Sequence, residues 1–171
     1  EDDPEVAPRI EPDCADLPYT LRAYFAFKLG LPFGYSRCTR GSSRHPPACR
    51  SWASSLTGND GSTGAVRRLG NFLRVKVANA VHSGTVRVRG ENDEGDFYPV
   101  ALTADSLRPG TVFADPYGHI LVLVQRIPQT PSKGGLLLAV DGQPDGTVSR
   151  RRFWRGNCLC ADGPVFGGPG A

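Results

Sequence analysis

The spacing of the apolar residues changes near residue 84, and this change constrains the fold more than any other feature of the chain. Before it, apolar residues recur every three or four positions, as on one face of a helix. After it, they alternate with polar residues or form short runs bounded by glycine and proline. Helices first and strands second is an order typical of an α+β domain, in which an antiparallel sheet packs on the helices.

Two helices are predicted in the first half of the chain. The first follows an extended lead-in of residues 1–12, has Asp16 as its expected N-cap and stops at Gly30-Leu31-Pro32. Its expected buried face consists of Leu17, Leu21, Tyr24, Phe25 and Leu29. The second helix spans about residues 63–82 and is expected to bury Val66, Leu69, Leu73, Val77 and Val81.

Residues 34–62 separate these helices and are rich in Gly, Ser and Arg. A loop of this length is uncommon inside a compact domain and is usually functional or disordered. Two interpretations are open. The segment is either a surface insertion tied by a disulfide, or a flap over a substrate that would use Trp52.

Strands are predicted over residues 85–89, 97–100, 111–114, 120–125, 136–140 and 148–154. Turn sequences such as Pro109-Gly110 and Pro144-Asp145-Gly146 separate the later strands. The chain of 171 residues is long enough for one sizeable domain, which we place at residues 13–160. Residues 161–171 are expected to form a loose tail rich in Gly and Pro.

Five cysteines are an odd number, which in a secreted chain indicates disulfide pairs and one free thiol. Cys14 is the candidate for the free thiol. Cys38 and Cys49 flank a loop rich in Gly, Pro and Ser that a disulfide would close. Cys158 and Cys160 are too close in sequence for a relaxed bridge to each other. A zinc site that combines the cysteines with His45 is the alternative, but the paired spacings of structural zinc sites are absent.

The net charge of +3 mildly favours an anionic polymer as partner. Residues 150–155 mix Arg with Phe153 and Trp154, as binders of single-stranded nucleic acid do, but a terminal strand with a solvated basic face explains the same pattern. No apolar run reaches the roughly 18 residues that span a bilayer. The chain starts without methionine or a signal peptide, so we expect a processed product or an excised piece.

A thiol and an imidazole occupy positions that suit a nucleophile and its base. Cys14 lies in Asp13-Cys14-Ala15-Asp16 at the start of the first helix, and His119 follows Pro116-Tyr117-Gly118 at the start of an apolar strand. A helix N-terminus and a nearby imidazolium both favour the reactive thiolate. Asp141, at the end of the next apolar run, could hold the imidazole, with Gln143 as the alternative; Asp141 could equally be a turn residue.

These motifs resemble the papain-like cysteine hydrolases of the NlpC and CHAP type, which act on cell walls. The resemblance rests on the cysteine at a helix start, on Leu107-Arg108-Pro109-Gly110-Thr111-Val112-Phe113 and on Gly118-His119-Ile120-Leu121-Val122. It implies a papain-like α+β fold and a catalytic set of Cys14, His119 and Asp141, with the Cys14 backbone N–H stabilising the oxyanion. Residues expected to border the substrate cleft are Asp13, Asp16, Trp52 and Tyr117.

The resemblance implies a secreted or periplasmic bacterial hydrolase that cleaves an amide bond in peptidoglycan stem peptides through an acyl-enzyme. Two alternatives stay open: a papain-like transglutaminase or deamidase acting on protein glutamine, and a catalytically inactive secreted binding module with disulfides. No metal or cofactor is expected. The expected partners are the peptide substrate and an inhibitor or immunity protein, whereas nucleic acid is not expected, and the chain should be a monomer.

Overall fold

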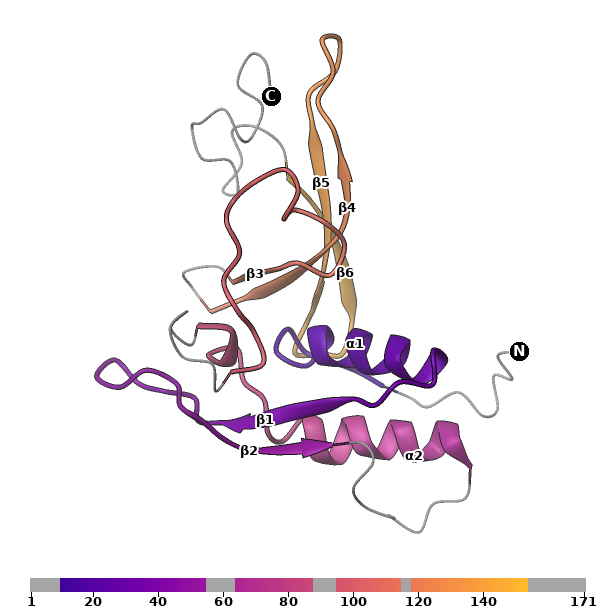
Figure 1. Cartoon of the computed structure of the whole chain (residues 1–171), viewed down its shortest axis with the longest axis vertical. Coiled ribbons are helices and arrows are strands. Elements are labelled where there is room, and N and C mark those ends of the chain that lie inside the picture. Colours follow the sequence, from indigo (N-terminus) through magenta and orange to yellow (C-terminus); the bar gives the residue numbers. More distant parts are fainter. Residues whose placement is uncertain (1–9, 55–63, 88–94, 115–117, 154–171) are drawn as a thin grey trace.

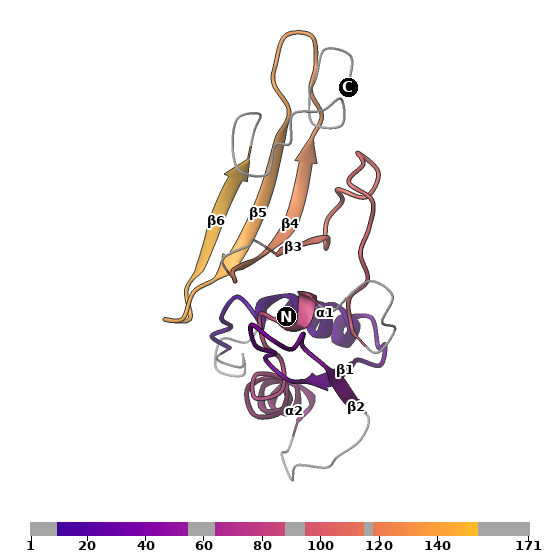
Figure 2. The same cartoon turned by 90° about the vertical axis from the view of Figure 1, so that its left-hand side faces the viewer.

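The molecule consists of a helical layer and a four-stranded sheet that rises from it (Figures 1 and 2). The computed structural model describes residues 10–54, 64–87, 95–114 and 118–153. The helical layer contains α1 (Leu17–Lys28), α2 (Ala65–Asn71) and the two-stranded ribbon of β1 (Gly34–Cys38) and β2 (Cys49–Ser54). The α+β class with antiparallel sheets, predicted from the spacing of apolar residues, is confirmed. None of the helices in these ranges is both long and apolar enough to cross a bilayer.

Helix α1 forms where it was predicted, but it buries a different face. The Asp13 side chain accepts hydrogen bonds from the backbone N–H groups of Ala15 and Asp16, at 2.7 and 3.0 Å. Asp16 occupies the N-cap position without a capping bond from its own side chain, and Pro18 lies in the first turn, where its missing N–H costs nothing.

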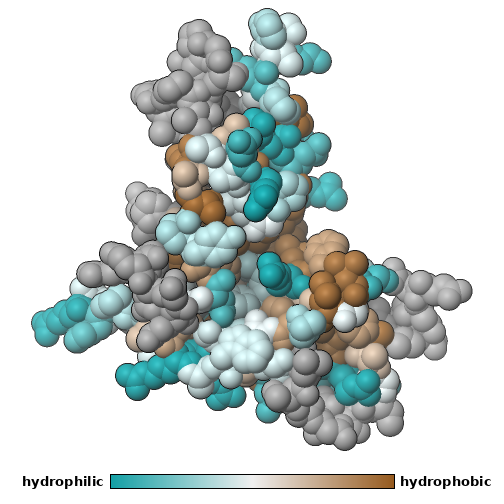
Figure 3. All heavy atoms as spheres, in the orientation of Figure 1, coloured by the Kyte–Doolittle hydropathy of each residue, from teal (hydrophilic) through white to brown (hydrophobic). Residues whose placement is uncertain are grey.

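The buried stripe of α1 is Tyr19, Ala23 and Ala26 rather than the predicted stripe of larger residues. Leu17 is buried as predicted, whereas Tyr24, Phe25 and Leu29 are exposed. Both stripes have helical spacing, so the periodicity could not choose between them. Figure 3 shows hydrophobic side chains exposed near α1. Ala23 and Ala26 pack in one cluster with Leu73 and Val77, and this packing decided which face is buried.

Residues 34–54 form a hairpin rather than the predicted loop. β1 and β2 pair in antiparallel fashion, with Cys38 opposite Cys49, and a disulfide joins these two residues. The predicted disulfide is thus confirmed, and it takes both thiols away from any zinc site. Residues 55–63 lie outside the described part of the chain.

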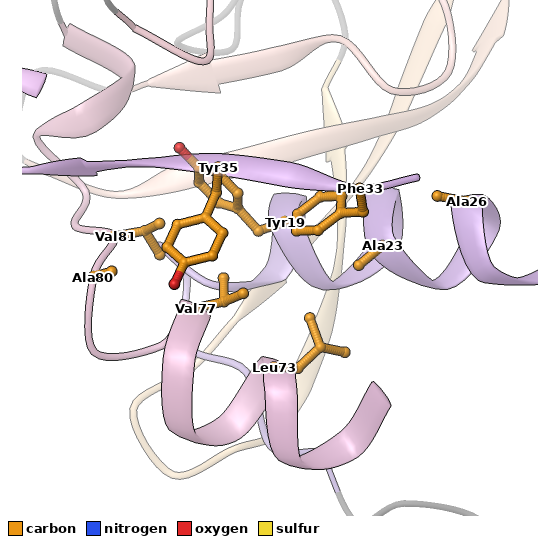
Figure 4. Packing of buried hydrophobic residues seen from close by; sticks show 9 residues of the cluster. All are labelled: Tyr19, Ala23, Ala26, Phe33, Tyr35, Leu73, Val77, Ala80 and Val81. Carbon is orange, nitrogen blue, oxygen red and sulfur yellow. The ribbon is translucent and has the colours of Figure 1, made fainter. Parts of the chain in front are cut away.

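The second helix is shorter and less regular than predicted. α2 continues into a π-helical segment, Phe72–Val77, and the chain then turns. Leu73, Val77 and Val81 are buried as predicted. They meet α1 and β1 in a hydrophobic cluster whose buried members are Tyr19, Ala23, Ala26, Phe33, Tyr35, Leu73, Val77, Ala80 and Val81 (Figure 4). We call this the helical-layer cluster.

Four antiparallel strands form the sheet in the order β3-β4-β5-β6. They are β3 (Val112–Ala114), β4 (Ile120–Ile127), β5 (Leu136–Gly142) and β6 (Val148–Phe153), close to the predicted ranges. One face carries a second hydrophobic cluster, the sheet cluster, whose buried members are Leu107, Leu121, Leu123, Leu137, Ala139 and Phe153. Neighbouring strands supply nearly all of it, so the sheet builds its own core.

Two predicted strands are wrong. Thr85–Arg87 forms a short 3-10 turn, and the rest of that predicted strand lies outside the described residues. Thr85 is buried, donates its backbone N–H to the His82 carbonyl and accepts from the His82 N–H through its hydroxyl. These local bonds hold a turn in place of a strand. Residues 97–100 are irregular because Phe97 packs edge to face on Tyr19 and Pro99 cannot donate to a sheet.

Candidate functional site

His119 and Asp141 meet at one end of the sheet. Val122 pairs with Val140 between β4 and β5, so His119 and Asp141 fall on the same face as diagonal neighbours. The imidazole Nε2 lies 2.7 Å from Asp141 Oδ2. The carboxylate is fully buried, whereas the imidazole is 31% exposed. The carboxylate therefore fixes the ring in one orientation, while the ring can still be reached from outside.

Arg151 on β6 is a further partner of the same carboxylate. Arg151 pairs with Ala139 across the sheet, which brings its side chain to the face that carries Asp141. Its Nε donates to Asp141 Oδ2 at 2.9 Å, and 48% of its side chain is exposed. One oxygen atom thus receives both the imidazole and the guanidinium. The pairing places the basic patch of residues 150–153 in a terminal strand, the simpler of the two interpretations of that patch.

Gln143, the alternative partner for the imidazole, lies in the turn after β5. Its backbone N–H donates to Thr147 and its carbonyl accepts from Gly146. Within the part of the chain that the structure describes, Gln143 Nε2 and Asp141 Oδ1 are buried and have no hydrogen-bond partner. Of these two candidates, Asp141 is the one that bonds to His119, and it lies inside β5 rather than in a turn.

Cys14 is half-buried in the turn that leads into α1 and forms no disulfide. The chain just before it packs on the end of β5. A Cβ atom at Gly142 would overlap the carbonyl oxygens of Pro12 and Asp13, so the two backbones are in direct contact there. Gly142 follows Asp141 directly. The thiol segment thus lies at the same end of the sheet as the imidazole and the carboxylate.

The surroundings of the Cys14 thiol raise its pKa. Burial raises the pKa of Cys14, and the negative charges of Asp13 and Asp141 raise it further. Hydrogen bonding from the backbone N–H of Ile120, the residue after His119, acts in the opposite direction, as does the N–H of Cys14 itself. The net direction is opposite to the thiolate expected at a helix start. Any attack by this sulfur needs a base that removes its proton.

The remaining residues expected at the substrate cleft are spread over the molecule. Asp13 and Asp16 flank Cys14, and burial together with the charge of Asp13 raises the pKa of Asp16 to about 6. Trp52 lies on the β1–β2 ribbon, where it lines a separate pocket with Ser36 and Asp96. Tyr117, like Cys158 and Cys160, lies outside the described residues.

Sequence analysis missed two contributors to this site, Arg151 and the Ile120 N–H. Alternation along β6 could have placed Arg151 on one face of its strand, but its pairing with Asp141 depends on the strand register. No protein-family model, curated protein or solved structure matches the chain.

Proposed function

We propose that this protein is a cysteine hydrolase that cleaves an amide bond, with Cys14 as nucleophile, His119 as base and Asp141 as the group that orients the base. The observation that carries this proposal is the 2.7 Å hydrogen bond between His119 and Asp141, made at the end of the sheet on which the Cys14 segment packs. A nucleophile, a base and a carboxylate that orients the base are the parts that covalent amide hydrolysis needs.

Because the pKa of Cys14 is raised, the sulfur must lose its proton as it attacks. The imidazole of His119 accepts the Cys14 proton as the sulfur attacks the amide carbonyl, while Asp141 holds the ring through Nε2. The imidazolium then gives this proton to the leaving amine as the C–N bond breaks, which leaves a thioester on Cys14. Water, deprotonated by His119, attacks the thioester and releases the acid and the thiol. Asp141 stabilises the imidazolium in both halves of the cycle.

Peptidoglycan stem peptides are the proposed substrate class, and the proposed fold is papain-like. The motifs around Cys14 and His119 support both through their resemblance to the NlpC and CHAP cell-wall hydrolases. The Cys38–Cys49 disulfide fits a protein of an oxidising compartment, where cell walls are built. The net charge of +3 also suits an anionic cell wall.

Turnover of purified peptidoglycan is the direct test. Release of new amino groups should occur with the unaltered chain and should fall by at least about 100-fold in Cys14→Ala and His119→Ala, because general base catalysis alone contributes that much. Asp141→Asn should reduce the rate less than either. His45→Ala is the matched control, since His45 lies in the tip of the β1–β2 hairpin. Full activity of Cys14→Ala would overturn the proposal.

Two further measurements distinguish hydrolysis from acyl transfer and from an inactive module. If a primary amine added to the reaction appears in the product in place of water, the enzyme is a transferase of the transglutaminase kind. The raised pKa of Cys14 also fits a non-catalytic module with a structural thiol. Such a module would give no covalent Cys14 adduct with a peptide thioester, whereas the hydrolase should form an acyl-enzyme visible by mass spectrometry.

A further inference from the structure

The β1–β2 ribbon carries a pocket that the chemistry at Cys14 does not use. The pocket has a volume of about 770 Å³ and is open to solvent. This size lies within the range typical of small-molecule sites. Its lining is mainly polar, with one large aromatic surface, and includes Ser36, Arg50, Ser51, Trp52 and Asp96.

Trp52 is held as a fixed platform in this pocket. A Cβ atom at Gly34 would overlap Cζ2 and Cε2 of the indole, so the ring rests directly on the backbone of the opposite strand. The residue is nevertheless 66% exposed. An indole that is supported on one side and open on the other offers a large flat apolar surface at little cost in side-chain entropy.

The Asp96 carboxylate of the pocket is also held in place. The Asp96 carboxylate accepts hydrogen bonds from the Ser36 backbone N–H, the Ser36 hydroxyl and the Tyr19 hydroxyl, each as short as 2.8 Å. Tyr19 is itself buried in the helical-layer cluster. The carboxylate therefore keeps its position whether or not the pocket is occupied.

We propose that this pocket binds a saccharide ring, stacked on Trp52. A pyranose has one face of C–H groups and a rim of hydroxyls, so it can cover an indole while its hydroxyls bond to polar groups such as Arg50 and Ser36. A purely apolar ligand would leave the Arg50 guanidinium without a hydrogen-bond partner from the ligand. A polyanion would meet the Asp96 carboxylate, so an uncharged sugar is the better match than a nucleic acid.

The saccharide site would also add a binding step to the proposed function. Its role in catalysis rests on that function. Tyr19 contacts Asp96 from α1, the helix whose first turn follows Cys14. One helix thus connects the pocket to the thiol. In peptidoglycan, a glycan strand carries the stem peptides, so the pocket would hold the strand while a stem peptide reaches Cys14. Sugar binding itself needs no reaction at Cys14 and is tested without it.

Calorimetric titration of the full Cys14→Ala chain with the tetrasaccharide of N-acetylglucosamine tests the proposal. We expect saturable binding, weakened at least 10-fold in Trp52→Ala. Gly34→Val should weaken it similarly, because the new side chain displaces an indole that is still present. Tyr98→Ala is the matched control, since Tyr98 is an exposed aromatic residue outside the pocket, and it should bind like the parent chain.

Fluorescence gives a second measurement at the platform itself. Trp52 and Trp154 are the two tryptophans of the chain, so Trp154→Phe leaves Trp52 as the single reporter. Its emission should shift to the blue as the sugar is added. Absence of binding, or equal affinity in Trp52→Ala, would overturn the saccharide site. Cleavage of a stem peptide that carries no sugar would show in that case that the hydrolase proposal stands independently.

Discussion

The helical-layer cluster and the sheet cluster are assembled in different ways. The helical-layer cluster joins α1 and β1 to the π-helical segment, which lies far from both in the sequence, and it relies on aromatic contacts such as Tyr35 with Phe72. The sheet cluster is mainly aliphatic and comes from strands that follow one another along the chain. Cys14 belongs to the first region, and His119 with Asp141 to the second. The difference teaches that the two regions build their cores from different kinds of contact, while the proposed chemistry needs residues from both.

The largest expected effect comes from the centre of each cluster. Tyr35→Ala should lower the free energy of unfolding by about 3–5 kcal/mol, because a fully buried ring that touches several elements leaves a large cavity. Leu123→Ala should cost less, about 2–4 kcal/mol. Urea denaturation followed by circular dichroism measures both. A larger loss in the sheet variant would contradict the idea that the helical layer depends more on single large side chains.

Removal of the Cys38–Cys49 disulfide should give the second-largest loss of stability, and it acts on the helical layer. The bridge closes a sequence separation of 11 residues, for which chain entropy gives about 2–3 kcal/mol. The double variant Cys38→Ala, Cys49→Ala keeps both buried positions apolar and avoids new polar groups. Its urea midpoint should fall, and reduction of the unaltered chain should produce the same shift. An unchanged midpoint would show that the hairpin is held by its strand pairing alone.

Arg151 tests how the sheet supports its buried carboxylate. Arg151→Ala removes one of two partners of Asp141 Oδ2, which should cost about 1 kcal/mol because the arginine end of the pair is half-exposed. If Asp141 orients the imidazole, kcat should fall several-fold with little change in KM. Arg152→Ala is the matched control, since Arg152 is the next residue on β6 and points to the other face. Equal behaviour of the two variants would remove Arg151 from the site.

Asp16→Asn should raise the free energy of unfolding slightly, and only at a pH where Asp16 carries a negative charge. The pKa of Asp16 in the folded chain, about 6, lies above the ordinary value of 3.8, so the folded chain holds more protons between these values and its stability falls as pH rises through them. At pH 7 the replacement should recover about 1 kcal/mol, less than the full difference because the carboxyl is only partly buried. Melting temperatures from pH 4 to 8 measure this, with Asp105→Asn, an exposed carboxylate, as control.

Local patterns were enough to predict the sheet. The run from Ile120 to Val124 and the turns around it determine β4 without help from distant residues, and the same holds for β5 and β6. The disulfide and the free Cys14 were also predicted, from the sequence around the cysteines and from their odd number. The contact between His119 and Asp141 required only that two consecutive strands pair in antiparallel fashion.

The helical layer was predicted less well because its outcome depends on distant partners. α1 has two apolar stripes, and only its contact with Leu73 and Val77 decides that Ala23 and Ala26 are buried. Thr85 is polar and lies in an alternating pattern, yet its burial and its bonds to His82 produce a turn. Arg151 joins the candidate site through strand register, which no short stretch of sequence specifies.

Gly142 determines the clearance between the two regions. Because its backbone touches the carbonyl oxygens of Pro12 and Asp13, the smallest side chain at this position would separate the thiol segment from the end of β5. The hydrogen atom of Gly142, in place of a methyl group, thus lets the Cys14 segment pack against the end of the sheet that carries His119 and Asp141. If Cys14, His119 and Asp141 act together as proposed, a larger residue at position 142 should abolish the activity even though all three residues are intact.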